Sequence, residues 1–234
     1  MSANSDAVLL TDEQIQQFIC DGYIALESDV DPAVHQLIDE RLQYVKENEF
    51  HMGNNFMPRI PEFHLVTDCP VVRGALISIL GADYMLYSHR CIHWRDPEKE
   101  PVSDELFNER VRGDSHQDSY PPFLNWRSHP HQFVRMMYYP HDTELVNGPT
   151  HVVPGSHYHG GVSEEDRHNE IPITGKAGTV FLSHFDIIHS GSPNQSDRVR
   201  NMMKFIFARG RRADHPSWDH VDATWKNLNT KAPY

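Results

Sequence analysis

The sequence has few cysteines and no long apolar run, and each shortage excludes a class of protein. Cys20, Cys69 and Cys91 are widely separated and odd in number, so neither a disulfide framework nor a Cys-x-x-Cys metal or redox motif is expected. This cysteine usage favours a reducing, cytoplasmic setting. No stretch of about 18 apolar residues occurs, and the opening MSANSDAVLL lacks a basic region followed by an apolar run. We therefore expect neither a membrane helix nor an export signal.

Positive charge is also in short supply. The 234 residues include 21 Lys and Arg against 33 Asp and Glu, a net charge of −12, so a phosphate backbone or an anionic bilayer would be approached against repulsion. We expect a small-molecule substrate, no nucleic acid, no membrane and no obligate protein partner. A highly anionic substrate would need a local basic patch, for which the candidates are Arg127, Arg135, Arg209, Arg211 and Arg212.

The length predicts one domain over residues 1–234, and residues 8–80 show helix signals. Thr11 and Gln14 have capping-box spacing, and Gly22 ends this first helix before a short strand at 23–26. Asp31 and Pro32 begin a second helix. Its apolar stripe consists of Val34, Leu37, Ile38, Leu42 and Val45. A third helix is expected over residues 70–80, ending at Gly81.

After Gly81 the pattern changes to short apolar runs separated by Gly, Pro, Asn and Asp, which is typical of many short strands. The runs are YMLYSHRCIHW, QFVRMMYYP, THVVP, AGTVFLS, DIIHS and NMMKFIFAR. No helix of convincing period lies between them, and residues 95–114 and 154–175 are interpreted as long loops. The prediction is a mainly β fold with flanking helices, an antiparallel sandwich or jelly roll with its core at 83–208 and a tail at 209–234.

Three His-x-Asp triplets occur, where the 17 histidines and 19 aspartates give about 1.4 by chance, so the triplet alone carries little information. A metal that binds O₂ and substrate together needs two His and one carboxylate on one face, as in non-heme Fe(II) oxygenases. For His116 and Asp118 the third ligand on another strand is His189. The rival triplets are less suitable: His184-Phe185-Asp186 is too close to His189, and His220-Val221-Asp222 has no later histidine.

Arg200 lies eleven residues after His189, where a turn at SPNQSD would return the chain beside the metal strand. An arginine there can bind a carboxylate through two parallel hydrogen bonds. Arg198 is the alternative.

In this order of motifs the chain resembles the phytanoyl-CoA dioxygenase-like (PhyH) branch of the Fe(II)- and 2-oxoglutarate-dependent oxygenases. The resemblance is carried by LTDEQIQQFICDGYIAL, DSHQD, NGPTHVVPGSHYHG and AGTVFLSHFDIIHSGSPNQSDRVRNMMKF. It implies a double-stranded β-helix of the cupin-like kind, Fe(II) held by His116, Asp118 and His189, and 2-oxoglutarate and O₂ as co-substrates. Arg200 would bind the distal carboxylate of 2-oxoglutarate.

The resemblance also implies hydroxylation, or a related desaturation or ring closure, because Asp118 is present where halogenating relatives have a small residue. A polar contact to 2-oxoglutarate from the strand before the metal pair stays unassigned among Arg90, His93, Trp94 and Arg95. Two other classes of function remain open: a cupin-like Zn or Mn hydrolase or isomerase, and a non-catalytic small-molecule-binding jelly roll.

Overall fold

The computed structural model describes residues 7–49, 53–118 and 133–209. Predictions that fall on other residues lie outside this range. These are the rival triplet at His220 and Asp222, the patch candidates Arg127, Arg211 and Arg212, and the tail beyond Arg209.

The N-terminal helices begin and end largely where their capping residues predict. Helix α1 (Asp12–Asp21) has a full capping box between Thr11 and Gln14 and ends at Gly22, whose φ of 79° is left-handed. Strand β1 (Tyr23–Glu27) follows. Asp31 caps α2 (Pro32–Asn48) and accepts a hydrogen bond from the backbone of Ala33. Two further helices, α3 (Phe63–Thr67) and α4 (Pro70–Leu80), complete this part.

One residue of the predicted stripe on α2 is not a core residue. Ile38, Leu42 and Val45 are buried, whereas Leu37 is 38% exposed. Leu37 directly precedes Ile38, so it lies about 100° around the helix from the buried face.

The strands form two antiparallel sheets. The larger has the order β1-β6-β3-β8-β2, and the smaller has the order β5-β4-β7. The bounds are β2 Met85–Arg95, β3 Phe133–Tyr138, β4 Thr150–Val152, β5 Ile171–Pro172, β6 Thr179–His184, β7 His189–Gly191 and β8 Arg200–Ala208. Three short 3-10 helices lie in the connections, at Leu145–Asn147, Ser156–Tyr158 and Asp166–His168. Two facing antiparallel sheets with helices outside confirm the predicted mainly β, jelly-roll fold.

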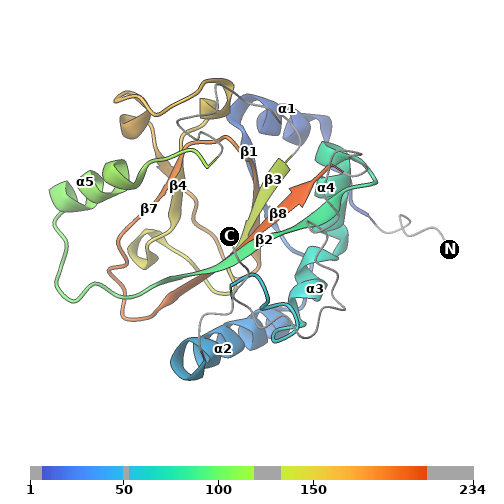
Figure 1. Ribbon diagram of the computed structural model, residues 1–234, viewed down its shortest axis with the longest axis horizontal. Helices are drawn as coiled ribbons and strands as arrows, with labels where there is room; N and C mark the ends of the chain where they lie inside the picture. The colour runs from blue at the N-terminus through green and yellow to red at the C-terminus, as the bar shows by residue number, and fades with distance from the viewer. Residues whose placement is uncertain (1–6, 50–52, 119–132, 210–234) are drawn as a thin grey trace.

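Alternation along β8 separates two cores. Met203, Phe205 and Phe207 point toward the helices and join the larger cluster, which includes buried residues of α2, α3 and α4. Met202 points the other way, into a smaller cluster between the two sheets. Figure 1 shows α2, α3 and α4 along one side of the larger sheet and β4, β7 and α5 on the other. A site between the two sheets would therefore be lined by the inward face of the larger sheet.

The segment at 95–114 is not the long loop that the sequence predicted. It contains helix α5 (Asp104–Asp114), capped by Ser103, whose side chain accepts from the backbone of Leu106. Val111 is the one buried residue of this helix, so the apolar period that would have revealed it is nearly absent. Its capping serine and the acidic first turn, Asp104 and Glu105, stabilise it instead.

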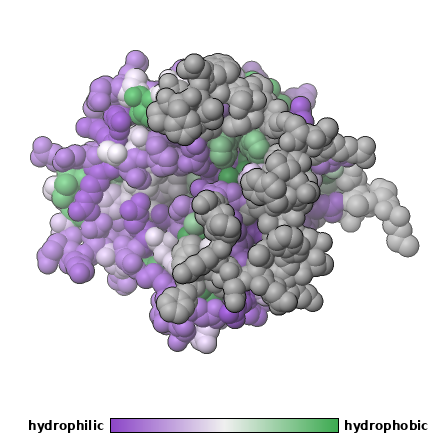
Figure 2. All heavy atoms as spheres, viewed as in Figure 1, coloured by the Kyte–Doolittle hydropathy of each residue, from purple (hydrophilic) through white to green (hydrophobic). Residues whose placement is uncertain are grey.

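On the face shown in Figure 2, the described residues are mostly hydrophilic, and the hydrophobic ones form small separate groups. Within the described range, no helix combines the length and the apolar character needed to cross a membrane.

Candidate metal centre

Backbone pairing brings His116 and His189 together, although 73 positions separate them in the chain. His116 follows α5, and His189 is the first residue of β7. The two residues form an antiparallel bridge with both N–H to O distances at 3.0 Å. Opposed residues of such a pair project to the same side, and the two ring centroids lie 4.3 Å apart.

Both imidazoles are oriented by a backbone carbonyl. Nδ1 of His116 lies 2.6 Å from the carbonyl oxygen of Asp114, and Nδ1 of His189 lies 3.1 Å from that of Ile187. A carbonyl oxygen can only accept, so each Nδ1 carries a proton, and in the neutral form of either ring the lone pair lies on Nε2. Hydrogen bonds of this kind fix the tautomer of metal-binding histidines.

Asp118 completes the group. Its Oδ1 lies 3.6 Å from Nε2 of His116, and one ligand atom from each of His116, Asp118 and His189 lies within 4.8 Å of the others. No other set of three His, Cys, Asp or Glu side chains in the described part of the chain comes together in this way. His184 and Asp186 instead face each other at the end of β6, with Nδ1 and Oδ2 4.0 Å apart.

Gln117, between the two predicted ligands, is directed away from them and anchors the segment. Its Nε2 donates to the carbonyl oxygens of Asp186, at 2.7 Å, and His159, at 3.0 Å. Its Oε1 accepts from the backbone of Gly161 at 2.8 Å. In extended backbone, residues i and i+2 share a side while i+1 points to the other. The contacts of Gln117 therefore fix the side on which His116 and Asp118 lie.

Two cations lie beside Asp118. Nη2 of Arg135, on β3, is 2.6 Å from Oδ2 of Asp118, and Nζ of Lys204, on β8, is 3.9 Å from the same oxygen. Burial raises the pKa of the Asp118 carboxyl, but the charges of Arg135 and Lys204 hold this pKa well below its ordinary value. Asp118 is thus a carboxylate at working pH, the form that binds a metal ion.

The electrostatics of His189 favour the neutral ring. Burial, and then the charge of Arg135, lower the pKa of His189 well below its ordinary value. A neutral imidazole is the metal-binding form. Two imidazoles and one carboxylate are the donor set of non-heme Fe(II) oxygenases, so the residues present fit Fe(II).

Arg200 begins β8 and is 3% exposed. Its Nε donates to the carbonyl oxygen of Gly148 at 3.1 Å, and its Nη1 to that of His93 at 3.4 Å. None of the described carboxylates forms an ion pair with it. Burial lowers the pKa of Arg200 to about 10, so the side chain stays charged. Arg198, the alternative, is instead paired with Asp39 and is 46% exposed.

The register of β2 against β8 separates the four candidates on the strand before the metal pair. His93 and Arg95 lie opposite Met202 and Arg200, on the inward face. Trp94 packs against the core beneath the helices, and Nε of Arg90 donates to the carbonyl oxygen of Asn54. Burial lowers the pKa of His93 to about 3, and its buried Nε2 has no hydrogen-bond partner among the residues that the structure describes.

Three residues near the predicted ligands, Gln117, Arg135 and Lys204, had no role at the metal in the prediction from the sequence. Arg135 was considered only as part of a basic patch, and Gln117 and Lys204 were not considered. The alternation of NMMKFIFAR contained a signal, because Lys204 shares the face of Arg200 and interrupts an otherwise apolar strand. Arg209, another patch candidate, donates instead to the carbonyl oxygen of Leu80.

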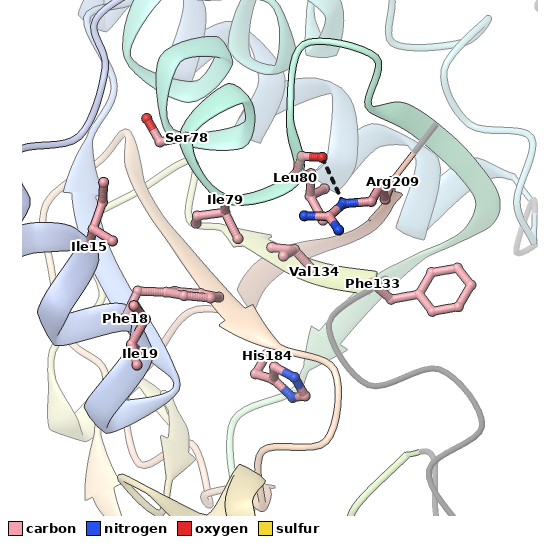
Figure 3. Close-up of a pocket in the computed structure, with 10 residues that line it drawn as sticks. All are labelled: Ile15, Phe18, Ile19, Ser78, Ile79, Leu80, Phe133, Val134, His184 and Arg209. Carbon is pink, nitrogen blue, oxygen red and sulfur yellow. Dashed lines mark hydrogen bonds between the residues drawn. The ribbon is translucent and has the colours of Figure 1, made fainter. Parts of the chain in front are cut away.

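A separate apolar cavity of about 180 Å³ lies between α1, α4 and β3. Figure 3 shows side chains of α1 (Ile15, Phe18) facing Ile79 of α4, with Arg209 hydrogen-bonded to Leu80 at the far edge. None of His116, Asp118 or His189 lines this cavity, so it is distinct from the metal centre.

Solved structures with a similar fold include three proteins whose names mention 2-oxoglutarate, also called alpha-ketoglutarate. The epimerase SnoN from nogalamycin biosynthesis is 13% identical, with a TM-score of 0.66 over 91% of this chain and 88% of that one. The carbocyclase SnoK from the same biosynthesis is 16% identical, with a TM-score of 0.64 over 89% and 86%. EctD from S. alaskensis with 2-oxoglutarate and 5-hydroxyectoine is 18% identical, with a TM-score of 0.63 over 91% and 84%.

At these identities the likeness establishes the jelly-roll fold. A search among curated proteins found no match. The sequence itself matches the family described as phytanoyl-CoA dioxygenase (PhyH) over residues 18–202, which is most of the chain and includes all four predicted site residues. The chain therefore belongs to the PhyH family of Fe(II)- and 2-oxoglutarate-dependent oxygenases.

Proposed function

We propose that this oxygenase hydroxylates, desaturates or cyclises a small organic substrate, with O₂ and 2-oxoglutarate consumed and succinate and CO₂ released. His116, Asp118 and His189 hold the Fe(II). The observation that carries this proposal is the convergence of their three ligand atoms within 4.8 Å, with both Nδ1 atoms already hydrogen-bonded. Bound Fe(II) supplies a centre for O₂ activation with positions left open for the co-substrates.

Arg200 binds the distal carboxylate of 2-oxoglutarate in this proposal. It is a buried guanidinium that contacts only backbone carbonyls among the described groups, and it lies on the inward face of β8. A buried cation without a carboxylate partner is costly, so an entering dicarboxylate gains a fixed and still charged partner. Arginine suits this role because its planar fork donates two parallel hydrogen bonds.

His93 is the contact from the strand before the metal pair. Its ring is inward-facing and neutral, and its Nε2 lacks a hydrogen-bond partner within the described ranges. Of the four candidates, Trp94 and Arg90 are on the opposite face. Arg95 also faces inward, but His93 offers a neutral hydrogen-bonding ring, and its carbonyl oxygen already accepts from Arg200. We therefore assign His93 to the co-substrate.

The outcome of the reaction depends on the substrate. Structures with this fold include a carbocyclase and an epimerase as well as EctD bound to 5-hydroxyectoine, so the fold is compatible with several outcomes. Asp118 as a metal ligand favours hydroxylation, desaturation or ring closure over halogenation. A reducing, cytoplasmic location is part of the proposal, consistent with three free cysteines.

The test is a screen for substrate-stimulated succinate formation over a panel of metabolites, with Fe(II), 2-oxoglutarate and O₂ each omitted in turn. We expect each omission to abolish succinate. Substrate turnover with Zn(II) under nitrogen would instead identify a hydrolase or isomerase. Binding of a metabolite without turnover under either condition would identify a non-catalytic binding protein.

A further inference from the structure

The inward face of the larger sheet carries more positive charges than the Asp118 carboxylate can neutralise. Arg135 on β3, and Arg200 and Lys204 on β8, all lie on the inward face of the larger sheet. Asp118 is the one carboxylate within ion-pair distance of any of them in the described range. These three cations and one carboxylate leave two positive charges, and Arg95, on the same face opposite Arg200, adds a third.

Other acidic groups near the site are directed elsewhere. Asp186 lies beside His184, the side chain of Glu170 accepts from Ser115, and Asp114 accepts from the backbone of Gly191. Among the described residues, no further carboxylate therefore neutralises these cations.

The surplus persists when the proposed cofactors are included. Fe(II) adds two positive charges and 2-oxoglutarate adds two negative charges, so the two cancel. Arg200 is assigned to the distal carboxylate of 2-oxoglutarate, and Arg135 is already bound to Asp118 at 2.6 Å. Lys204, 3.9 Å from the same oxygen, is the remaining cation beside the proposed metal ligands.

Lys204 is placed to meet a molecule other than 2-oxoglutarate. It lies four residues from Arg200 along β8, about 13 Å between their Cα atoms in an extended strand. Its side chain is 12% exposed, and it lies opposite Cys91 on β2 and Met137 on β3. Neither neighbour neutralises an ammonium group, and the one carboxylate near Lys204, that of Asp118, is bound more closely by Arg135.

We infer, on the basis of the oxygenase function proposed above, that the substrate bears an anionic group, a carboxylate or a phosphate, which Lys204 binds beside the metal. An ammonium is a compact point charge without the directional fork of a guanidinium. Lys204 therefore selects for negative charge at this position and accepts either kind of anion. This local cation is what allows a chain with a net charge of −12 to bind an anionic substrate.

The test compares matched anionic and neutral probes on the full chain loaded with Fe(II) and 2-oxoglutarate under nitrogen. Benzoate is paired with benzamide, hexanoate with hexanamide, and phenyl phosphate with phenol, and each dissociation constant is measured by calorimetry. The variants are Lys204→Met, which removes the charge at similar length, and Lys204→Arg, which keeps it. Lys176→Met is the control, because Lys176 pairs with Asp142 on the exposed surface.

We expect at least one anionic probe to bind the wild-type protein tenfold or more tightly than its neutral partner. This preference should disappear in Lys204→Met and persist in Lys204→Arg and Lys176→Met, while the dissociation constant of 2-oxoglutarate changes less than twofold. The carboxylate pairs and the phosphate pair identify which anion is preferred.

Three results would overturn the inference. The first is that no anionic probe binds wild-type protein more tightly than its neutral partner, a result that does not depend on the folding of any variant. The second is an unchanged preference in Lys204→Met. The third is a tenfold loss of 2-oxoglutarate affinity in Lys204→Met, which would assign Lys204 to the co-substrate. Failure of 2-oxoglutarate to bind the Fe(II)-loaded wild type would instead refute the proposed oxygenase function.

Discussion

Nη2 of Arg135 lies 2.6 Å from Oδ2 of Asp118, and the arginine side chain is fully buried. The same nitrogen also donates to the carbonyl oxygen of Phe185, and the guanidinium carbon lies 5.3 Å from the centroid of the Phe185 ring. Arg135 is thus held in place independently of Asp118. It occupies Oδ2 and leaves Oδ1, which lies 3.6 Å from Nε2 of His116, available to the proposed metal.

This relationship predicts that Arg135 positions Asp118. Replacing Arg135 with Gln should raise the dissociation constant for Fe(II) about 10- to 100-fold, the range typical of groups that orient metal ligands. Metal titration under nitrogen measures the change. Arg41→Gln, at an exposed arginine paired with Glu62, should leave the constant unchanged. Equal metal affinity in wild type and Arg135→Gln would show that the ion pair does not orient Asp118.

Gln117 should matter to the metal although it points away from it. In Gln117→Glu the side chain keeps its shape but loses both amide hydrogens that face the carbonyl oxygens of Asp186 and His159. We expect Fe(II) affinity to fall at least tenfold as the His116–Asp118 segment loosens. Gln36→Glu, on the exposed face of α2, is the control. If the two variants bind Fe(II) equally well, the anchoring role of Gln117 is wrong.

The choice among the three His-x-Asp triplets can be tested by substitution. His116→Ala and His189→Ala should each abolish stoichiometric Fe(II) binding, because each removes one of the three ligands. His220→Ala should bind Fe(II) normally. His64→Ala, at an exposed histidine in α3, controls for general effects. Loss of iron in His220→Ala with retention in His116→Ala would mean that another triplet binds the metal.

Arg200 and Arg198 provide a matched pair for the co-substrate. Arg200→Ala should retain Fe(II) but lose 2-oxoglutarate affinity at least tenfold, because removing one member of a buried charge pair costs about 2 to 5 kcal/mol. Arg198→Ala should have a mild effect, since that side chain is half-exposed and pairs with Asp39. Calorimetric titration of 2-oxoglutarate into the Fe(II)-loaded variants measures both. Normal binding by both variants would refute the assignment of a 2-oxoglutarate-binding arginine.

Local signals predicted much of the fold. The cap at Thr11, the left-handed Gly22 and the capping Asp31 are each recognised from a few adjacent residues. The inward face of β8 follows from simple alternation. Helix α5 was missed because only Val111 is buried there, and a helix stabilised by its caps and charges lacks the apolar period on which prediction depends.

The predicted triad could be chosen because strand order limits which distant histidine can approach a His-x-Asp pair. The pairing of Arg135 with Asp118, and of Gln117 with the carbonyls of Asp186 and His159, depends on contacts between segments distant in sequence. Such contacts cannot be inferred from the composition or the periodicity of the sequence. The residues that would position the proposed ligands could therefore be identified only from the folded structure, whereas the proposed ligands themselves could be chosen from the sequence.

The most direct test of the central claim is a crystal structure of the protein grown with Fe(II) and 2-oxoglutarate under nitrogen, with anomalous scattering recorded at the iron edge. We predict one iron peak, about 2 to 2.4 Å from Nε2 of His116, Nε2 of His189 and a carboxylate oxygen of Asp118. The 2-oxoglutarate should extend from this iron toward Arg200. An iron peak at His184 and Asp186, or none between His116 and His189, would contradict the account.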